Sequence, residues 1–393
     1  MSLPLEEVKI LDLSMYLPGP LCTQILADFG AEVIKIEEIG GEWGRRVYPL
    51  VGDQSALFYA VNRGKKSIAV NLKTEEGKEI FLNLVRHADV VVEQFRPGVM
   101  ERLGLDYETL GKINKRLIYC SISGYGHSGP LQYVAGHDLN YLSLAGVTGL
   151  TGTRDQPGMS GVQIADLAGG SLQAVSAILL ALLAREKTGR GQFCDIAMLD
   201  GAISLLAYSL AEWSGLGILP GRNRGMLTGG YACYQIYATA DNQFISLGAV
   251  EAKFWQRFCE KIDRQQYVSC QWDGDRQDDI LADIQSVMAS KTRQEWENFF
   301  ADDDICFTPV LNLQEMAQHP QVKNRNMIIV MEDAQGSGKN MMLTGCPIKL
   351  SHTPAEVQVA FPQLGEHTDI ILQRIGYSSR EIARLKEEKV LGP

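Results

Sequence analysis

The sequence predicts an α/β fold built on a parallel sheet. Short apolar runs rich in Val and Ile, at 8–13, 31–37, 89–93 and 117–122, alternate with segments of helical pattern at 21–29, 75–86 and 107–114. Strands that alternate with helices in this way are typical of parallel sheets with crossover helices. The length of 393 residues also predicts a second domain or a large excursion, because a single core rarely grows beyond about 250–300 residues.

The elements of the first region follow one another with clear boundaries. The first strand stops at Leu17-Pro18-Gly19-Pro20, and the helix that follows ends at Gly30, a residue suited to the end of a helix. A long apolar helix is expected near 170–185. Polar residues interrupt it and it is too short to span a bilayer, so we expect it to be buried. A strand at 193–198 and a helix at 199–213 come next.

The pattern changes after this first region. We expect residues 1–214 to form a large domain, and 215–230, with six glycines, to form a linker. A smaller α+β domain at 231–318 is predicted from strands at 231–237 and 244–249 and helices near 253–262, 276–290 and 293–300. Residues 319–393 are expected to return to the large domain and to end in a helix at 379–389.

Composition limits the kind of partner. The chain is 45% hydrophobic and 21% charged with a formal charge of −10, and it has no dense run of Lys and Arg. This argues against nucleic acid or an anionic membrane as the main partner. The eight cysteines are spread singly without metal-ligand spacing, and no secretory signal pattern is evident. We therefore expect a reduced, cytoplasmic protein that needs no metal.

Two titratable residues stand out as catalytic candidates. His137 follows Gly136, and Asp166 lies in a turn-like segment that ends in Gly169 and Gly170. An imidazole and a carboxyl group at a pocket mouth can share acid and base work on one carbon. If they lie on opposite faces of that carbon, the chemistry is that of a racemase or epimerase. Each residue also fits a local role, Asp166 as a helix N-cap and His137 as a hydrogen-bonded turn residue.

Several motifs occur in a recognisable order along nearly the whole chain, from about residue 5 to 375. In this order and spread they resemble the class III CoA-transferase and α-methylacyl-CoA racemase family (CaiB/BaiF-like). The motifs are Pro18-Gly19-Pro20, 26–37, 62–66, Arg96-Pro97-Gly98, 123–126, 189–192 and 364–368.

Within that family, Gly136-His137-Asp138 is similar to the motif of the racemase branch. The resemblance implies a Rossmann-like large domain, a smaller domain, an interlocked homodimer and a CoA thioester as substrate, with no separate cofactor. It implies that His137 and Asp166 are the acid/base pair and that Glu251 orients His137 across the dimer. Asp138 stays ambiguous, because an aspartate there can also cap nearby amides, and Glu251 can also be a solvated helix start.

CoA carries phosphates, which require cationic side chains. Arg63, Lys65, Lys66 and Arg96 occupy the matching positions, although a cluster such as 63–66 can also be solvated surface. Gly124, Tyr125 and Gly126 are expected where the backbone approaches the pantetheine arm, or in a tight turn. The segment from Gly124 to Gly129 fits a GxGxxG pattern, but it follows a late strand and runs into a proline, so it does not predict NAD or FAD.

These residues predict a racemase or epimerase that acts on 2-methylacyl-CoA thioesters by 1,1-proton transfer at the α-carbon through an enolate. Backbone N–H groups of 167–169, free at a helix start, are expected to stabilise the enolate oxygen. The alternative is a class III CoA-transferase in which Asp166 attacks the thioester and carries a covalent intermediate. A third hypothesis is a catalytically silent CoA-binding protein. The acyl group stays open.

Overall fold

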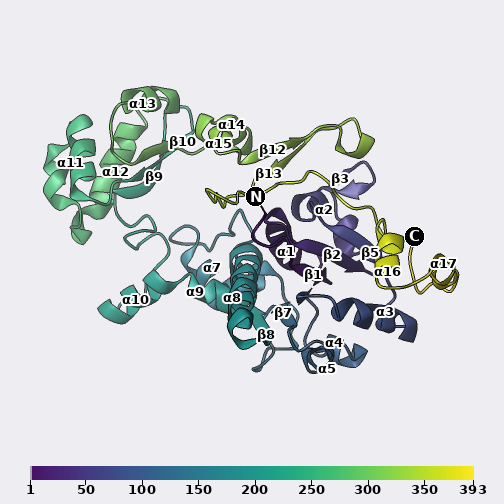
Figure 1. Cartoon of the computed structure of the whole chain (residues 1–393). Coiled ribbons are helices and arrows are strands. Elements are labelled where there is room, and N and C mark those ends of the chain that lie inside the picture. The colour runs from purple at the N-terminus through teal and green to yellow at the C-terminus, as the bar shows by residue number, and fades with distance from the viewer. Residues whose placement is uncertain (1) are drawn as a thin grey trace. The chain divides into compact units, whose positions relative to one another are not determined.

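The computed structural model describes residues 2–393, which form two compact units (Figure 1). The first holds the described residues up to Ala145, together with Gly161–Leu205 and Pro320–Pro393. The second holds Gly146–Ser160 and Leu206–His319. Residues 206–214, expected in the large domain, and the predicted linker 215–230 therefore both fall in the second unit, along with the excursion 146–160 that the sequence did not reveal.

The first unit contains a six-stranded parallel sheet, which confirms the predicted α/β class. Its strands lie in the order β5-β2-β1-β6-β7-β8. After β1, the chain adds β2 and β5 outward on one side of β1. It then returns to place β6 on the other side of β1, and β7 and β8 follow outward from β6. The bounds are β1 Lys9–Asp12, β2 Glu32–Glu37, β5 Lys66–Ala69, β6 Val90–Glu93, β7 Ile118–Ser123 and β8 Phe193–Ala197.

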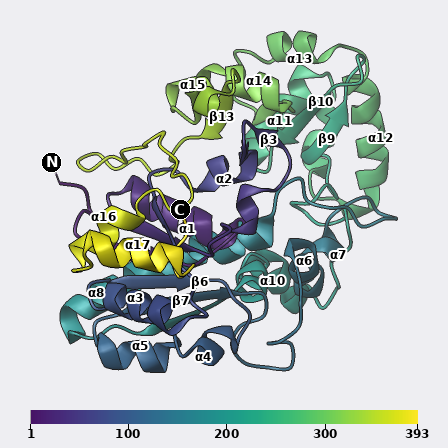
Figure 2. The ribbon, with the colours of Figure 1, turned by 90° about the vertical axis from the view of Figure 1, so that its right-hand side faces the viewer.

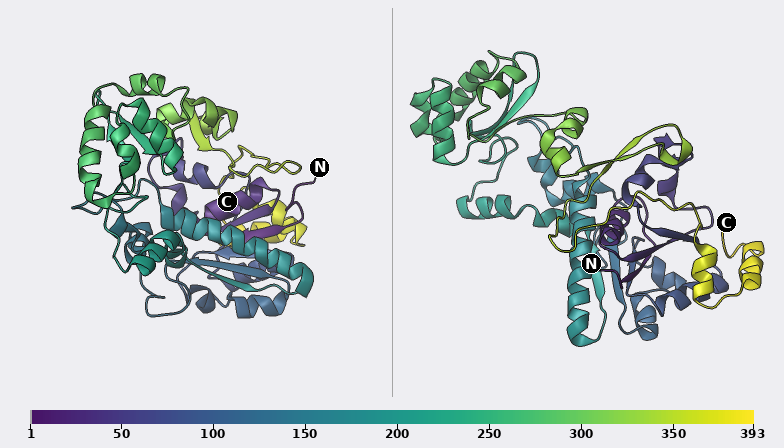
Figure 3. Two further views of the ribbon diagram at one scale, coloured as in Figure 1. Left: turned by 90° about the vertical axis from the view of Figure 1, so that its left-hand side faces the viewer. Right: turned by 45° about the horizontal axis from the view of Figure 1, so that its top comes forward.

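Helices cover both faces of this sheet (Figure 3). On one face α1 (Pro18–Asp28) contacts α8 (Gln173–Thr188), and α8 also contacts β7 and β8. On the other face α3 (Glu75–Val85) contacts α5 (Tyr107–Ile113). All residues of β6 and β7 are buried, as expected for central parallel strands covered on both sides. The near-continuous apolar runs that predicted these strands reflect this two-sided burial.

The C-terminal segment completes the core of the first unit. Helices α16 (Thr368–Arg374) and α17 (Ser379–Glu387) add Ile371, Leu372, Ile382 and Leu385 to the main apolar cluster of the sheet. Figure 2 shows both helices beside the N-terminal strands, far from them in sequence.

The predicted burial of the long apolar helix is only half right. One face of α8, with Ala174, Val175 and Ile178, is buried, whereas Leu180 and Leu183 are each 66% exposed. Together with the segment before it, Ala165–Thr188 is long and apolar enough to cross a membrane by length and composition alone, so the expectation that this helix is too short to span a bilayer is wrong. Its buried face packs on the sheet in the manner of a core helix, while the other face leaves an apolar stripe on the surface of the chain.

The second unit is an α+β structure with its own core. Its antiparallel sheet has the order β11-β10-β9, with β9 Tyr234–Ala238, β10 Phe244–Gly248 and β11 Phe307–Pro309. The first two strands are the expected pair, and the short β11 is additional. Helices α11 (Ala252–Lys261), α12 (Gln277–Met288) and α13 (Arg293–Phe299) supply much of the apolar cluster.

The other helices and strands are short. They are β3 Leu50–Val51, β4 Gln54–Ser55, α2 Ala56–Val61, α4 Val99–Leu103, α6 Asp138–Ala145, α7 Val147–Leu150, a π-helical segment Ala165–Leu172, α9 Met198–Ser204, α10 Ala207–Leu216, α14 Leu313–Gln318, α15 Pro320–Asn324, β12 Ile328–Met331 and β13 Met341–Thr344, with single 3₁₀ turns at Trp43–Arg45, Gln265–Cys270, Gly274–Arg276 and Ala334–Gly336.

Candidate functional site

The main candidate site lies where the sheet changes direction. The chain leaves β1 and β6 toward opposite sides of the sheet, so a crevice opens beyond the carboxyl ends of these two strands. A cavity of about 760 Å³ lies there. It is lined by Met15–Pro18 after β1 and by Gln94–Pro97 after β6, with further residues that follow β7 and β8. The strand order therefore gives a physical reason for a ligand site at this edge.

The two predicted catalytic residues meet in this cavity. His137 and Asp166 both line it, although 28 other residues separate them in the chain. His137 lies in the loop before α6 and is exposed, whereas Asp166 is partly buried in the π-helical segment Ala165–Leu172. An imidazole open to solvent and a partly buried carboxyl group thus face one volume.

The sequence context of Asp166 suggested a helix N-cap, but Asp166 does not occupy a cap position. It is the second residue of the π-helical segment, and the backbone N–H of Leu167 already donates to the carbonyl of Gln163 at 2.9 Å. The expectation that a free Leu167 amide stabilises the enolate is therefore wrong. π-Helical turns are rare and are frequent at functional sites, which fits the position of Asp166.

Close backbone contact explains the glycines that follow Asp166. A Cβ on Gly169 would lie 2.8 Å from the carbonyl oxygen of Met198, and one on Gly201 would lie 2.3 Å from the carbonyl oxygen of Gly169. Only glycine at both positions lets the π-helical segment lie against α9. The Ala-Gly-Gly sequence after Asp166 and Leu167 is thus a packing requirement that holds this segment in place.

The electrostatics of Asp166 suit a proton donor. Burial raises the pKa of its carboxyl group to about 7, and the negative charge of Asp138 adds to this rise. The group therefore exchanges its proton near neutral pH and can act either as an acid or as a base.

Asp138 connects the two catalytic segments. The sequence left open that it caps the amides of Asn140 or Tyr141, but both of these amides donate to the carbonyl of His137, at 2.8 and 3.3 Å. The Oδ1 atom of Asp138 instead accepts the backbone N–H of Asp166 at 3.0 Å. The residue next to His137 therefore fixes the backbone of Asp166.

Tyr141 is a site residue that sequence reasoning missed. Its ring is buried and packs edge-on against Tyr125, with the ring centroids 5.2 Å apart, and its hydroxyl donates to the carbonyl of Gly136 at 2.6 Å. A Cβ on Gly124 or on Gly136 would lie only 2.5 or 2.7 Å from the ring. Gly124 thus makes room for Tyr141, which supports the backbone just before His137. The only sequence signal was its position four residues after His137.

Two predicted phosphate ligands are corrected by the structure. Arg63 is 3% exposed and donates to both carboxylate oxygens of Asp28, at 2.9 and 2.7 Å. Lys65 is equally inaccessible and donates to Asp12 at 2.9 Å and to Asn62 at 2.8 Å. These cations balance buried carboxylates, because an unpaired buried charge is costly. They stabilise the fold and are not available to a ligand.

The remaining predicted binding residues divide into two groups. Lys66 begins β5 and pairs with Glu32, and Gly126 has a left-handed backbone with φ of 83°; neither is among the residues that line the cavity. Arg96, Gly124 and Tyr125 do line it. Arg96 is exposed and forms no ion pair with a carboxylate in the described residues, so it is available to an anion.

A second cavity of about 500 Å³ shares Phe95 and Val99 with the first. Lys73 and Arg102 line it. Arg102 was not singled out from the sequence, since it lies on α4 without a neighbouring motif. Lys73 pairs with the exposed Glu38 at 3.4 Å. These two cations and Arg96 line cavities that share Phe95 and Val99, in contrast to the buried Arg63 and Lys65.

Gln94 is a further residue that the sequence did not single out. It follows β6 directly, lines the main cavity, and accepts the backbone N–H of Gly19 through Oε1 at 2.9 Å. That bond orients the amide so that its N–H₂ end is the one left to donate. Across residues 2–393, no group of three or more His, Cys, Asp or Glu side chains is placed to hold a metal ion.

Comparison with known proteins agrees with this geometry. The family model described as CoA-transferase family III matches residues 5–368. The chain belongs to CoA-transferase family III. This family III protein is 34% identical to the human alpha-methylacyl-CoA racemase over 98% of this chain and 97% of that one. It is 37% identical to the acetyl-CoA:oxalate CoA-transferase of Acetobacter aceti over 88% and 89% of the two chains.

Its fold is that of solved family members. The crystal structure of a CaiB/BaiF family protein from Brucella suis superposes with a TM-score of 0.82 at 31% identity, covering 95% of this chain and 100% of the other. The family III protein thus has racemases and transferases among its relatives at similar identity. Glu251, predicted to orient His137, precedes α11 in the second unit and is exposed, and its role stays a prediction.

Proposed function

We propose that this family III protein is a racemase or epimerase of 2-methylacyl-CoA thioesters. The observation that carries the proposal is the pairing of Asp166, whose pKa burial raises to about 7, with His137 in one cavity at the carboxyl ends of the strands. A two-base reaction needs one group that holds a proton and one that accepts it, and both states of Asp166 are populated near neutrality.

The reaction follows from these two groups. A neutral His137 takes the α-proton from one face of the substrate, and the electron pair of the C–H bond passes into the enolate. The protonated carboxyl group of Asp166 then gives its proton to the opposite face. In the reverse direction an ionised Asp166 removes the proton and a protonated His137 returns it. Asp138 and Tyr141 keep the two segments in place through their contacts with the backbone of Asp166 and Gly136.

The thioester oxygen needs a hydrogen-bond donor as negative charge develops on it. Since the Leu167 amide is occupied, we assign this role to the N–H₂ group of Gln94, which lines the same cavity. Arg96 and the adjoining cavity with Lys73 and Arg102 offer positive charge for the CoA phosphates.

The second candidate is a CoA-transferase, and the similarity to transferases at 37% identity favours it. In that reaction the carboxylate of Asp166 attacks the thioester carbonyl and forms an acyl anhydride while CoA leaves. The attacking carboxylate must be ionised, whereas a pKa near 7 leaves both the acid and the carboxylate populated at neutral pH, as proton transfer in both directions requires. The racemase reaction uses His137 as an acid/base group, whereas the transferase reaction gives it no role.

One experiment separates the two reactions. A resolved 2-methylacyl-CoA is incubated in D₂O without any acceptor acid, and deuterium at the α-carbon and the configuration of the product are followed. We expect deuterium uptake with loss of configuration. In parallel, treatment with hydroxylamine or borohydride and mass analysis of the peptide with Asp166 should show an unmodified residue. A trapped adduct together with exchange that depends on an acceptor acid would establish the transferase instead.

A homodimer forms part of the proposal. The exposed apolar stripe on α8, with Leu179, Leu180 and Leu183, is a surface that a second copy of the chain would cover. Sedimentation or light scattering should give twice the mass of the 43.4 kDa chain. A monomer at micromolar concentration would contradict this part.

A further inference from the structure

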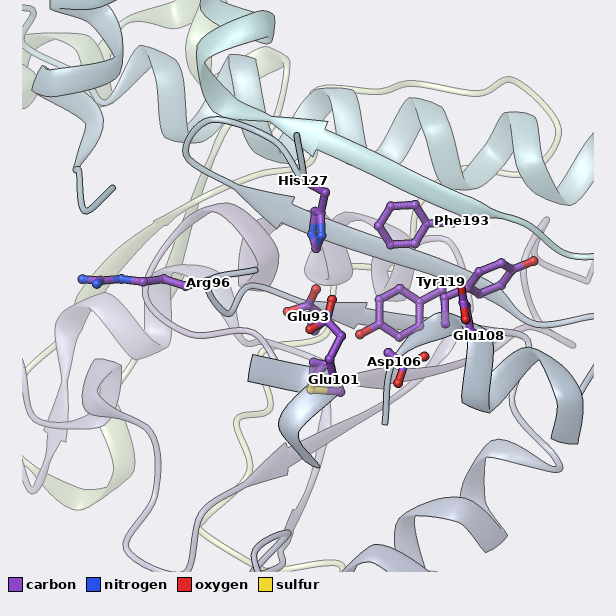
Figure 4. Close-up of a pocket in the computed structure, with 10 residues that line it drawn as sticks. Glu93, Arg96, Glu101, Asp106, Glu108, Tyr119, His127 and Phe193 are labelled. Carbon is purple, nitrogen blue, oxygen red and sulfur yellow. The ribbon is translucent and has the colours of Figure 1, made fainter. Parts of the chain in front are cut away.

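A third cavity borders the catalytic one. It measures about 490 Å³, and Arg96 is common to the lining of both cavities. Figure 4 shows its side chains: the carboxyl groups of Glu93, Glu101 and Asp106 lie close together below His127, while the side chain of Arg96 extends away from them. Glu93 lies in the wall between this cavity and the segment that carries Gln94, Phe95 and Arg96.

Glu93 holds the start of that segment. It is the last residue of β6, it is 2% exposed, and it forms no ion pair in the described residues. Its Oε2 atom accepts the backbone N–H of Phe95 at 2.7 Å. This hydrogen bond therefore holds the turn that leads from β6 to Arg96, and the geometry of the turn depends on the strength of the bond between the Phe95 N–H and the Glu93 carboxyl group.

Ser121 on β7 connects Glu93 with His127. It is the partner of Glu93 in the sheet register, its hydroxyl lowers the pKa of the Glu93 carboxyl group, and its Oγ lies 2.6 Å from Nε2 of His127. His127 is partly exposed and lines the cavity, and its backbone N–H donates to Asp195 at 3.1 Å. His127 and Ser121 thus give protons a route from solvent to the Glu93 carboxyl group, which itself lines this cavity.

We propose that Glu93 is a positioning residue for the CoA-ester site: its carboxylate fixes the segment from Gln94 to Arg96, and its protonation through Ser121 and His127 weakens ester binding. The inference rests on the proposed function only in taking this cavity as the CoA-ester site. Glu93 does not touch the substrate and acts through the segment that does.

The surroundings of Glu93 place its titration near neutral pH. Burial raises the pKa of this carboxyl group to about 7, opposed by the hydrogen bonds from Ser121 and Phe95. The charges of Glu101 on α4 and of Asp195 on β8 add to the rise. The other groups that face it are His127, Arg96, Tyr119 on β7, and Asp106 and Glu108 at the start of α5.

The sign of the effect follows from the ionised form. Above about pH 7 the carboxylate accepts the Phe95 N–H with its full charge, and such bonds are stronger than neutral ones. Below that pH the neutral acid holds the segment less firmly. Affinity for CoA should therefore increase as pH rises through neutrality.

The test is the dissociation constant of CoA, measured by calorimetry from pH 6 to 8.5. The wild type should bind about three- to tenfold more tightly at the upper end. Glu93→Gln mimics the neutral acid, so it should equal the wild type at pH 6 and should lack this gain. Glu108→Gln is the matched control, because Glu108 lines the same cavity and is exposed, but it makes no hydrogen bond to Phe95 and is not among the charges that raise the pKa of Glu93. Titration of the CoA phosphate is common to all three proteins and cancels in the comparison.

Two further readouts separate positioning from simple structural damage. The segment that Glu93 fixes also carries Gln94, the donor assigned to the enolate oxygen. The rate of α-deuterium uptake at saturating ester in Glu93→Gln should therefore equal the wild-type rate at pH 6 and fall below it only above about pH 7, whereas simple structural damage would lower it at every pH. Ser121→Ala removes the bond that lowers the pKa of Glu93, so the midpoint of the affinity change should move to higher pH.

The outcomes distinguish the two proposals. If wild type binds no CoA at any pH, the proposed function fails. If it binds CoA but Glu93→Gln has the same pH dependence, the role of Glu93 is overturned. Should Glu93→Gln fail to fold, an unmoved midpoint in Ser121→Ala overturns it equally.

Discussion

The contact between Gly124 and Tyr141 gives a prediction whose size comes from the structure. In Gly124→Ala the new Cβ would lie 2.5 Å from Cε1, 2.7 Å from Oη and 2.8 Å from Cζ of Tyr141, whereas ordinary contacts begin near 3.4 Å. The ring must therefore retreat by about 1 Å. It is 5% exposed and its hydroxyl is bonded to the Gly136 carbonyl, so the movement displaces the backbone before His137.

A displacement of this size has two expected effects. A misplacement of about 1 Å at a catalytic group costs on the order of 10²-fold in rate, so α-deuterium uptake at saturating ester should fall by about that factor. Overpacking of a buried ring typically costs about 1–3 kcal/mol, so the free energy of unfolding in urea should fall by a similar amount.

The assay compares Gly124→Ala with two other proteins. Gly161→Ala is the control, because a Cβ there meets nothing within 4 Å. In the double variant Gly124→Ala/Tyr141→Ala the clash is gone, so the two changes should not add. A wild-type rate and stability in Gly124→Ala would refute the assignment of Tyr141 as the support of His137.

Four further predictions concern the catalytic residues and the anion site. His137→Ala should lower racemisation, followed by chiral analysis of the product, by about 10²- to 10⁴-fold; a near-normal rate would remove it from the mechanism. Because Asp166 donates only when protonated, kcat/KM in the direction that uses it as acid should fall above about pH 7, and Asp166→Asn, which has no acid proton to give, should lower racemisation by about 10²- to 10⁴-fold. The raised pKa of Asp166 also means that the native state holds one more proton than the unfolded chain between pH 3.8 and about 7. The free energy of unfolding, measured in urea, should therefore decline as pH rises through that window in the wild type, and it should decline less in Asp166→Asn. Arg96→Ala should weaken CoA binding by about 1.5–3 kcal/mol, with a larger loss for CoA than for dephospho-CoA if the 3′-phosphate is the contact, and an unchanged dissociation constant for both would contradict its role.

The sequence determined the α/β class and the main strands, because hydrophobic patterning is local. The run that becomes β6 is apolar on both faces, and those that become β1, β2 and β7 are rich in Ile, Val and Leu, so this pattern can be read without knowledge of their neighbours. It also singled out His137 and Asp166 through their motifs, and the structure places both at one cavity. The strand at Lys66–Ala69 was missed because its start reads as a cationic cluster.

Only the tertiary structure decided which charges are free. Arg63 and Arg96 look alike in sequence, but the partner of Arg63 is Asp28, 35 residues earlier, and that of Lys65 is Asp12, 53 residues earlier. The tertiary structure also decided the π-helical conformation around Asp166, which depends on contact between Gly169 and Gly201. It likewise decided that Glu93 accepts the backbone N–H of Phe95 and that Ser121 contacts His127. Burial and pairing are set by segments distant in the chain, and they decide whether a charged side chain supports the fold or meets a ligand.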